Sequence, residues 1–116
     1  MTYDPATMYA EAHAAGEAAA RAATPELMVV EGYGRTYYVP DGSCGFASIK
    51  GIRKNSRLGK WMVENGKVDA DSVSPGVYRW VHDYGQSKER KAAYAYAFAA
   101  VLVKYGVKCH VTVLDD

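Results

Sequence analysis

The feature that most constrains the fold is a long helical segment near the end of the chain. Residues 88–106, KERKAAYAYAFAAVLVKYG, combine many alanines with bulkier apolar side chains at helical spacing. Gln86 or Ser87 can begin this helix, Glu89 can close the cap, and Gly106 is an expected C-terminal glycine. The apolar stripe consists of Ala95, Phe98, Leu102 and Tyr105. We therefore expect one long helix with a single buried face.

The next segment, Val107–Leu114, alternates between two kinds of side chain. Valines and Cys109 occupy one side, whereas His110 falls on the other, which predicts a half-buried strand. Similar strand patterns appear in four earlier stretches, Leu27–Glu31, Arg35–Val39, Cys44–Ile52 and Val77–Tyr84. The first two are joined by a glycine-containing loop and read as a hairpin. In the last one valines face one side and aromatic residues the other, which suggests that both faces are at least partly covered.

A short helix is expected between the third and fourth of these strands. Asn55 or Ser56 can cap it, Leu58, Trp61 and Met62 share one face, and Asn65-Gly66 ends it. The order of elements predicts an α+β fold, a small mixed sheet of four to five short strands with two helices packed on it.

The N-terminal segment adds a further helix, which is rich in alanine. Asp4-Pro5 can begin this helix and Thr24-Pro25 ends it, while Gly16 weakens it. Its few bulky side chains allow two interpretations, a peripheral arm or a self-association helix that makes a homo-oligomer through residues 5–23. We expect residues 1–25 to form an arm and residues 26–116 a single α+β domain.

Composition narrows the class of protein. The chain has 116 residues, 49% of them apolar, a net charge of +1 and two cysteines that lie far apart. These values predict one domain with a real core and free thiols rather than a disulfide-built secreted scaffold. With no leader pattern and no long apolar run, the expected location is the cytoplasm.

Cys44 raises the question of nucleophilic catalysis. The stretch Asp41-Gly42-Ser43-Cys44 resembles the lead-in to the catalytic cysteine of ovarian-tumour-type deubiquitinating proteases, which also have a late histidine on a strand, where His110 would stand. In that family the cysteine begins a helix, whereas the residues after Cys44 read as a strand. The residues therefore favour a buried structural cysteine and no enzyme, with Cys44 and His110 as the alternative catalytic pair. A zinc site from Cys44, Cys109, His82 and His110 lacks metal-ligand spacing, so no metal and no cofactor are expected.

Positive charge gathers in two places. Residues 50–60, KGIRKNSRLGK, contain no acidic residue and lead directly into Trp61, and a smaller cluster begins the long helix. Residues 1–43 hold six acidic and two basic side chains, so the rest of the chain is basic. The second cluster opposes the dipole of its helix, which hints at a negative partner. The predicted binding residues are Lys50, Arg53, Lys54, Arg57, Lys60, Lys88, Arg90 and Lys91.

Three blocks together resemble a group of small proteins encoded by tailed phages, prophages and plasmids. These blocks are YAEAHAAGEAAARAATP, VPDGSCGFASI and YRWVHDYGQSKERKAAYAYAFAAVLVKYGVK. The resemblance implies a phage-encoded accessory protein of the host cytoplasm and assigns no functional residue. Our expectation is a non-enzymatic module that binds nucleic acid or an acidic host protein, with a cysteine hydrolase as the alternative.

Overall fold

The computed structural model describes residues 4–23, 45–69, 76–84 and 87–114 with their side chains, and residues 28–32, 35–39 and 115 by their backbone. The elements follow one another as α1 (Pro5–Ala22), β1 (Met28–Gly32), β2 (Arg35–Val39), β3 (Gly45–Arg53), α2 (Arg57–Glu64), β4 (Gly76–Trp80), α3 (Lys88–Lys104) and β5 (His110–Asp115). The predicted α+β class is confirmed.

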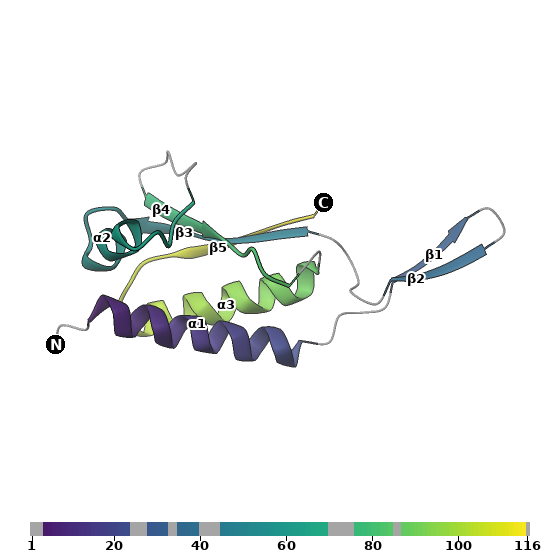
Figure 1. Ribbon diagram of the computed structural model, residues 1–116, viewed down its shortest axis with the longest axis horizontal. Helices are drawn as coiled ribbons and strands as arrows, with labels where there is room; N and C mark the ends of the chain where they lie inside the picture. The colour runs from purple at the N-terminus through teal and green to yellow at the C-terminus, as the bar shows by residue number, and fades with distance from the viewer. Residues whose placement is uncertain are drawn as a thin grey trace.

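The main sheet has three antiparallel strands in the order β4-β3-β5 (Figure 1). The helices α1 and α3 lie side by side on one face of it, and α2 lies at one end. The expected mixed sheet of four to five strands is therefore wrong in detail. The described strands β1 and β2 pair antiparallel with each other, as predicted for a hairpin, and contact no other described element.

The alanine-rich helix α1 is part of the packed body rather than an arm. Its N-terminus follows the predicted design, because the Asp4 carboxylate accepts a hydrogen bond from the Thr7 amide at 3.3 Å and Pro5 fills the first turn. Met8 and Tyr9 are each 7% exposed and Ala12 is fully buried. Small side chains let α1 approach α3 closely, so the partner of its shallow face is α3 of the same chain.

Gly16 lies where α1 packs tightly against α3. A Cβ atom built at this position would lie 2.6 Å from the ring of Tyr94 on α3. The glycine that weakens α1 in isolation is thus required by the packing of the folded chain.

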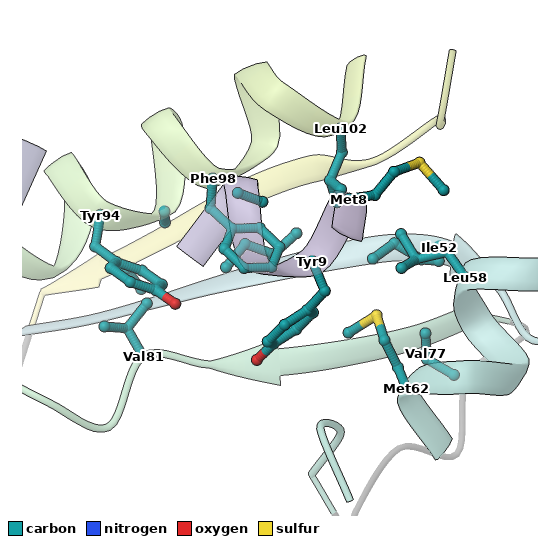
Figure 2. Packing of buried hydrophobic residues seen from close by; sticks show 14 of the residues in the cluster. Met8, Tyr9, Ile52, Leu58, Met62, Val77, Val81, Tyr94, Phe98 and Leu102 are labelled. Carbon is teal, nitrogen blue, oxygen red and sulfur yellow. The ribbon is translucent and has the colours of Figure 1, made fainter. Parts of the chain in front are cut away.

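The core lies between the two helices and the sheet (Figure 2). Aromatic rings from both helices meet there, with the Tyr9 and Phe98 centroids 5.4 Å apart and those of Tyr94 and Phe98 5.7 Å apart. Helix α2 closes one end with Leu58 and Met62. This arrangement leaves the opposite face of the sheet without a described helix over it.

A bulge in β3 explains the irregular alternation of this segment in the sequence. The pairing with β4 shifts between Ile49 and Ile52, and Gly51 has a φ of +86°, which favours glycine. The extra residue lets both Ile49 and Ile52 point into the core, where each is fully buried.

Candidate nucleic-acid interface

The outer face of the sheet carries side chains that the helices do not cover. Ala47 and Ile49 of β3 are fully buried towards the helices, so the pleat directs Phe46, Ser48 and Lys50 to the other side. Their register partners share this face. It therefore also includes Trp80, His110, Thr112 and Leu114. Tyr78 shares this face because it alternates with Trp80 along β4 and its ring lies under the Lys50 ammonium.

Aromatic rings and a lysine form a cluster on this outer face. The ring centroid of Trp80 lies 6.2 Å from that of Phe46 and 6.4 Å from that of Tyr78, both in edge-to-face contact. The ammonium of Lys50 lies 5.6 Å from the Trp80 centroid and 5.7 Å from the Tyr78 centroid. Phe46 remains 43% exposed, which is high for a large apolar side chain. Ser48 sits among these larger neighbours, fully buried, and its hydroxyl has no partner among the described residues.

Two clefts flank the end of the sheet where β3 finishes. The first, the face cleft, has a volume of about 330 Å³ and is lined by Lys50, Gly51, Gly76, Val77, Tyr78, Trp80 and His110. The second, the end cleft, has a volume of about 330 Å³ and is lined by Met8, Arg53, Ser56, Arg57, Leu58, Gly106, Val107 and Lys108. None of the described residues that line either cleft is acidic.

The turn from β3 into α2 holds two arginines beside the end cleft. The Ser56 hydroxyl accepts a hydrogen bond from the Gly59 amide at 3.0 Å and donates one to the Arg53 carbonyl at 2.6 Å. A Cβ atom at Gly59 would lie 2.0 Å from the Arg53 carbonyl oxygen, so only glycine permits this tight turn. Arg53 and Arg57 therefore lie on a rigid junction, and both are exposed.

We call Arg53, Lys54, Arg57, Lys60 and Lys108 the basic end. Lys54 and Lys60 are exposed, on the turn and on α2 respectively. Lys108 precedes β5, and the sequence-based prediction did not include it. Lys50 connects the basic end to the aromatic cluster, because it lies on the outer face only three residues before Arg53.

The second predicted cluster lies apart from the basic end, although the Lys91 ammonium lies 5.3 Å from the Phe46 ring centroid, at the far side of the aromatic cluster. This second cluster lies beside Gly45, at the opposite end of β3, about 25 Å from Arg53 at the usual rise per strand residue. Lys91 is only 6% exposed, and its ammonium donates a hydrogen bond to the Gly45 carbonyl at 3.3 Å. Arg90 donates to the Ala20 carbonyl at 3.1 Å, near the C-terminus of α1, and Lys88 packs against Gly45. The charge that opposes the dipole of α3 thus contacts carbonyl groups of the same chain.

Of the predicted catalytic pair, Cys44 lies outside the described residues, and His110 lies at the start of β5. The residue after Cys44, Gly45, pairs with Asp115, whereas His110 pairs with Lys50 further along the ladder. Cys109 is half-buried, its thiol lies 3.9 Å from the Ala99 carbonyl oxygen, and burial raises its pKa. Across the described ranges, no three His, Cys, Asp or Glu side chains gather as metal ligands.

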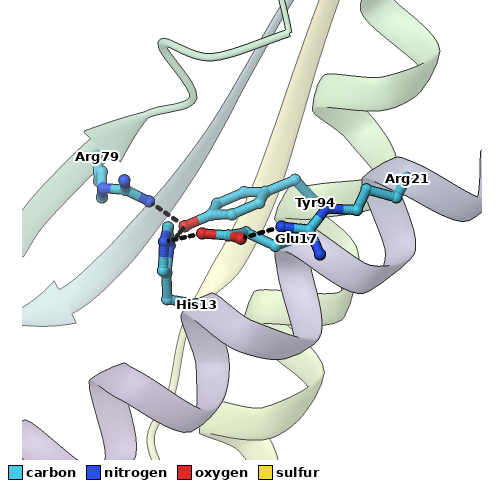
Figure 3. Close-up of polar contacts among 5 residues, drawn as sticks. All are labelled: His13, Glu17, Arg21, Arg79 and Tyr94. Carbon is cyan, nitrogen blue, oxygen red and sulfur yellow. Dashed lines mark hydrogen bonds and ion pairs between the residues drawn. The ribbon is translucent and has the colours of Figure 1, made fainter.

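Two histidines have partners that the sequence did not indicate. His82 contacts Asp69 rather than Asp83, with 2.8 Å between Nε2 and Oδ1. His13 was expected on a solvated face, but its Nδ1 lies 2.6 Å from the Tyr94 hydroxyl and its Nε2 contacts Glu17 (Figure 3). The chain of contacts extends from Glu17 to Arg21 at one end and from Tyr94 to Arg79 at the other.

The sequence pattern around β4 indicated that the aromatic residues share one face and that Arg79 lies on the other. In the alternating segment that contains β4, aromatic residues occupy one side, and Arg79 stands between Val77 and Val81 on the other. This pattern predicted a strand that is covered, at least in part, on both faces. The structure instead places Tyr78 and Trp80 on a face that no described helix covers, and Arg79 beneath the sheet.

Comparisons of the chain with protein-family models, curated proteins and solved structures find no significant match. Among the described helices, none is both long enough and apolar enough to cross a bilayer.

Proposed function

We propose that the protein is a non-enzymatic module that binds single-stranded nucleic acid on the outer face of the sheet β4-β3-β5. Bases stack on the aromatic cluster, and phosphates contact Lys50 and the basic end. The observation that carries this proposal is the position of Lys50, which lies between partly exposed aromatic rings and a group of arginines and lysines.

The aromatic cluster supplies the stacking surface. Every nucleobase has a π-face, so exposed rings bind single strands with little dependence on sequence, with about 1–3 kcal/mol per stacked base. Phe46 and Trp80 lie on adjacent strands with their centroids 6.2 Å apart, a separation that suits neighbouring bases. A duplex hides its base faces, so the cluster favours single strands over double strands.

The basic end supplies the electrostatic part of the affinity. Each phosphate neutralised on a single strand contributes about −0.7 to the slope of log K against log salt concentration. Ser56 and the first turn of α2 fix the backbone at Arg53 and Arg57 before binding, which reduces the backbone entropy lost on association.

An acidic host protein would also be attracted to the basic end. Binding of an acidic protein does not require aromatic rings beside the positive charge, whereas the outer face carries Tyr78 and Trp80 next to Lys50, and Phe46 next to Trp80. This combination favours nucleic acid. The sequence-based expectation of a phage-encoded accessory protein in the host cytoplasm is kept as part of the proposal.

Fluorescence anisotropy with labelled single-stranded RNA, single-stranded DNA and duplex DNA tests the proposal. We expect both single strands to bind more tightly than the duplex, with an affinity that falls steeply as salt rises. The substitution Phe46→Leu keeps the apolar volume and removes the π-face, so it should weaken binding about fivefold or more.

Tyr96→Leu is the matched control, because Tyr96 is 59% exposed on α3, away from the outer face. It should leave the affinity unchanged. Competition by polyglutamate as effective as that by the oligonucleotide, together with no effect of Phe46→Leu, would favour the acidic-protein alternative and reject the proposal.

A further inference from the structure

A third cleft lies along the free edge of β4, on the helix side of the sheet, apart from the proposed interface. We call it the edge cleft; it has a volume of about 290 Å³. The polar and ionisable side chains in its lining are Tyr9, His13, Lys67, Asp69, Arg79 and His82. They come from α1, from the segment after α2 and from β4 and its continuation, so the fold is needed to bring them together.

Arg79 is the central cation of the edge cleft. Its guanidinium lies 5.7 Å from the Tyr9 centroid, 5.3 Å from that of Tyr94 and 5.7 Å from that of Phe98. It donates a hydrogen bond to the Tyr94 hydroxyl at 2.6 Å (Figure 3). Within the described part of the chain it contacts no carboxylate, so its remaining N–H groups lack a protein acceptor. A guanidinium held against aromatic rings in this way is fixed in position before a ligand arrives.

Tyr9 contributes a second donor that has no partner among the described residues. Its side chain is only 7% exposed, yet its hydroxyl makes no hydrogen bond to any described residue and lines the cleft. Figure 2 shows the ring packed in the core, with the oxygen directed away from Phe98 and Leu102. Burial raises the pKa of Tyr9, so the hydroxyl keeps its proton at neutral pH and remains a donor.

Lys67 adds another hydrogen-bond donor to the edge cleft, whereas the acceptor oxygens of Asp69 are already in use. The ammonium of Lys67 lies 5.8 Å from the Tyr9 centroid, at the exposed side of the cleft. Asp69 is the one acidic side chain in the described lining, and both of its oxygens are engaged. One accepts the Trp80 amide at 2.7 Å and the other lies 2.8 Å from His82. The site therefore lacks acceptors and calls for a ligand rich in them.

We propose that the edge cleft binds a phosphate group through Arg79, Lys67 and the hydroxyl of Tyr9. The three donors come from three different elements, and a tetrahedral phosphate presents an oxygen to each of them. A carboxylate has two oxygens in one plane and matches this arrangement less well. The phosphate can belong to a mononucleotide or to the 5′ end of a nucleic acid strand, and the site does not depend on the proposed interface.

Chemical-shift titration of the backbone amides of Lys67, Asp69 and Trp80 tests this proposal. The ligands are inorganic phosphate, adenosine 5′-monophosphate, acetate, and an oligonucleotide with either a 5′-phosphate or a 5′-hydroxyl. We expect phosphate and the monophosphate to shift these amides at constant ionic strength and acetate to shift them far less. A preference for the phosphorylated oligonucleotide over the hydroxyl form assigns the site to strand ends, and a preference for the monophosphate assigns it to free nucleotides.

Two mild substitutions keep the test independent of folding. Tyr9→Phe removes a hydroxyl that no described residue uses, and Lys67→Gln changes an exposed side chain. Each should weaken phosphate binding about tenfold, as expected for a hydrogen bond to a charged group, without changing the unfolding midpoint.

The matched controls are Tyr96→Phe and Lys104→Gln, because Lys104 also lies over a tyrosine ring but outside the edge cleft. Both should leave phosphate binding unchanged. Acetate binding as tight as phosphate binding, no shift at millimolar phosphate, or Tyr9→Phe and Lys67→Gln binding as tightly as the unmodified protein would each overturn the assignment.

Discussion

Lys50 lies over the indole ring of Trp80, with its ammonium nitrogen 5.6 Å from the ring centroid. This contact places a positive charge and a stacking surface side by side on the face of the sheet opposite α1 and α3. Each nucleotide of a single strand has two matching parts, a phosphate that a positive charge attracts and a base that stacks on an aromatic ring. The relationship between these two residues is the basis of the proposed function.

The paired substitution Arg53→Gln and Arg57→Gln should weaken binding to all single-stranded sequences to a similar degree. Because these side chains are assigned to phosphates, the slope of log K against log salt should fall by about 1.4 in magnitude. Anisotropy titrations at several salt concentrations measure both quantities. Arg21→Gln with Lys104→Gln removes the same charge from α1 and α3 and should leave the slope unchanged; an equal fall in this control would contradict the assignment.

Gly16→Ala should destabilise the protein, although alanine favours helices. The gain in helix propensity is about 1 kcal/mol, but the new Cβ atom would lie 2.6 Å from the Tyr94 ring. Overpacking of this kind costs about 1–3 kcal/mol, which outweighs the gain and leaves a net loss of up to about 2 kcal/mol in urea unfolding. Ala18→Gly, at an exposed position of the same helix, measures the propensity alone. An increase in stability for Gly16→Ala would show that α1 and α3 are not in close contact.

Stability should fall at alkaline pH because of Tyr94. Burial raises the pKa of this hydroxyl to about 12, above its ordinary value of 10.0. The folded state therefore keeps the proton where the unfolded state has lost it. The contribution is fully present below pH 10.0 and is lost as pH rises towards about 12.

The loss from Tyr94 alone amounts to about 2–3 kcal/mol. Tyr94→Phe should flatten the decline in the free energy of unfolding over this range, whereas Tyr96→Phe, at an exposed position, should not. Equal declines in Tyr94→Phe and the unmodified protein would exclude the assignment.

The sequence predicted most of the elements, because their signals are local. Asp4-Pro5 and Ser87 begin helices as expected, and the alternation in β4 and β5 marks strands. The bulge at Gly51 could not be located, since it depends on how β3 pairs with β4. The role of α1 was missed because small residues give a weak pattern, and the Tyr94 ring that explains Gly16 is far away in the sequence.

The candidate site was predictable only in part. The basic run from Lys50 to Lys60 was found from composition and lies at one end of the sheet. Lys91 was predicted as a binding residue from its charge alone, and a sequence does not reveal that its ammonium lies against the Gly45 carbonyl and the Phe46 ring. The edge cleft could not be predicted from the sequence, because its residues come from three separate parts of the chain.

The two tryptophans of the chain provide the most direct test of the proposed interface. Trp80 lies on the outer face, whereas Trp61 packs on the helix side with its ring centroid 5.2 Å from that of Tyr9. The indole N–H signals of both can be followed in one spectrum as single-stranded oligonucleotide is added at low salt. The proposed interface predicts that the Trp80 signal shifts progressively and that the Trp61 signal stays in place. An unchanged Trp80 signal at saturating oligonucleotide, or a shift confined to Trp61, would contradict it.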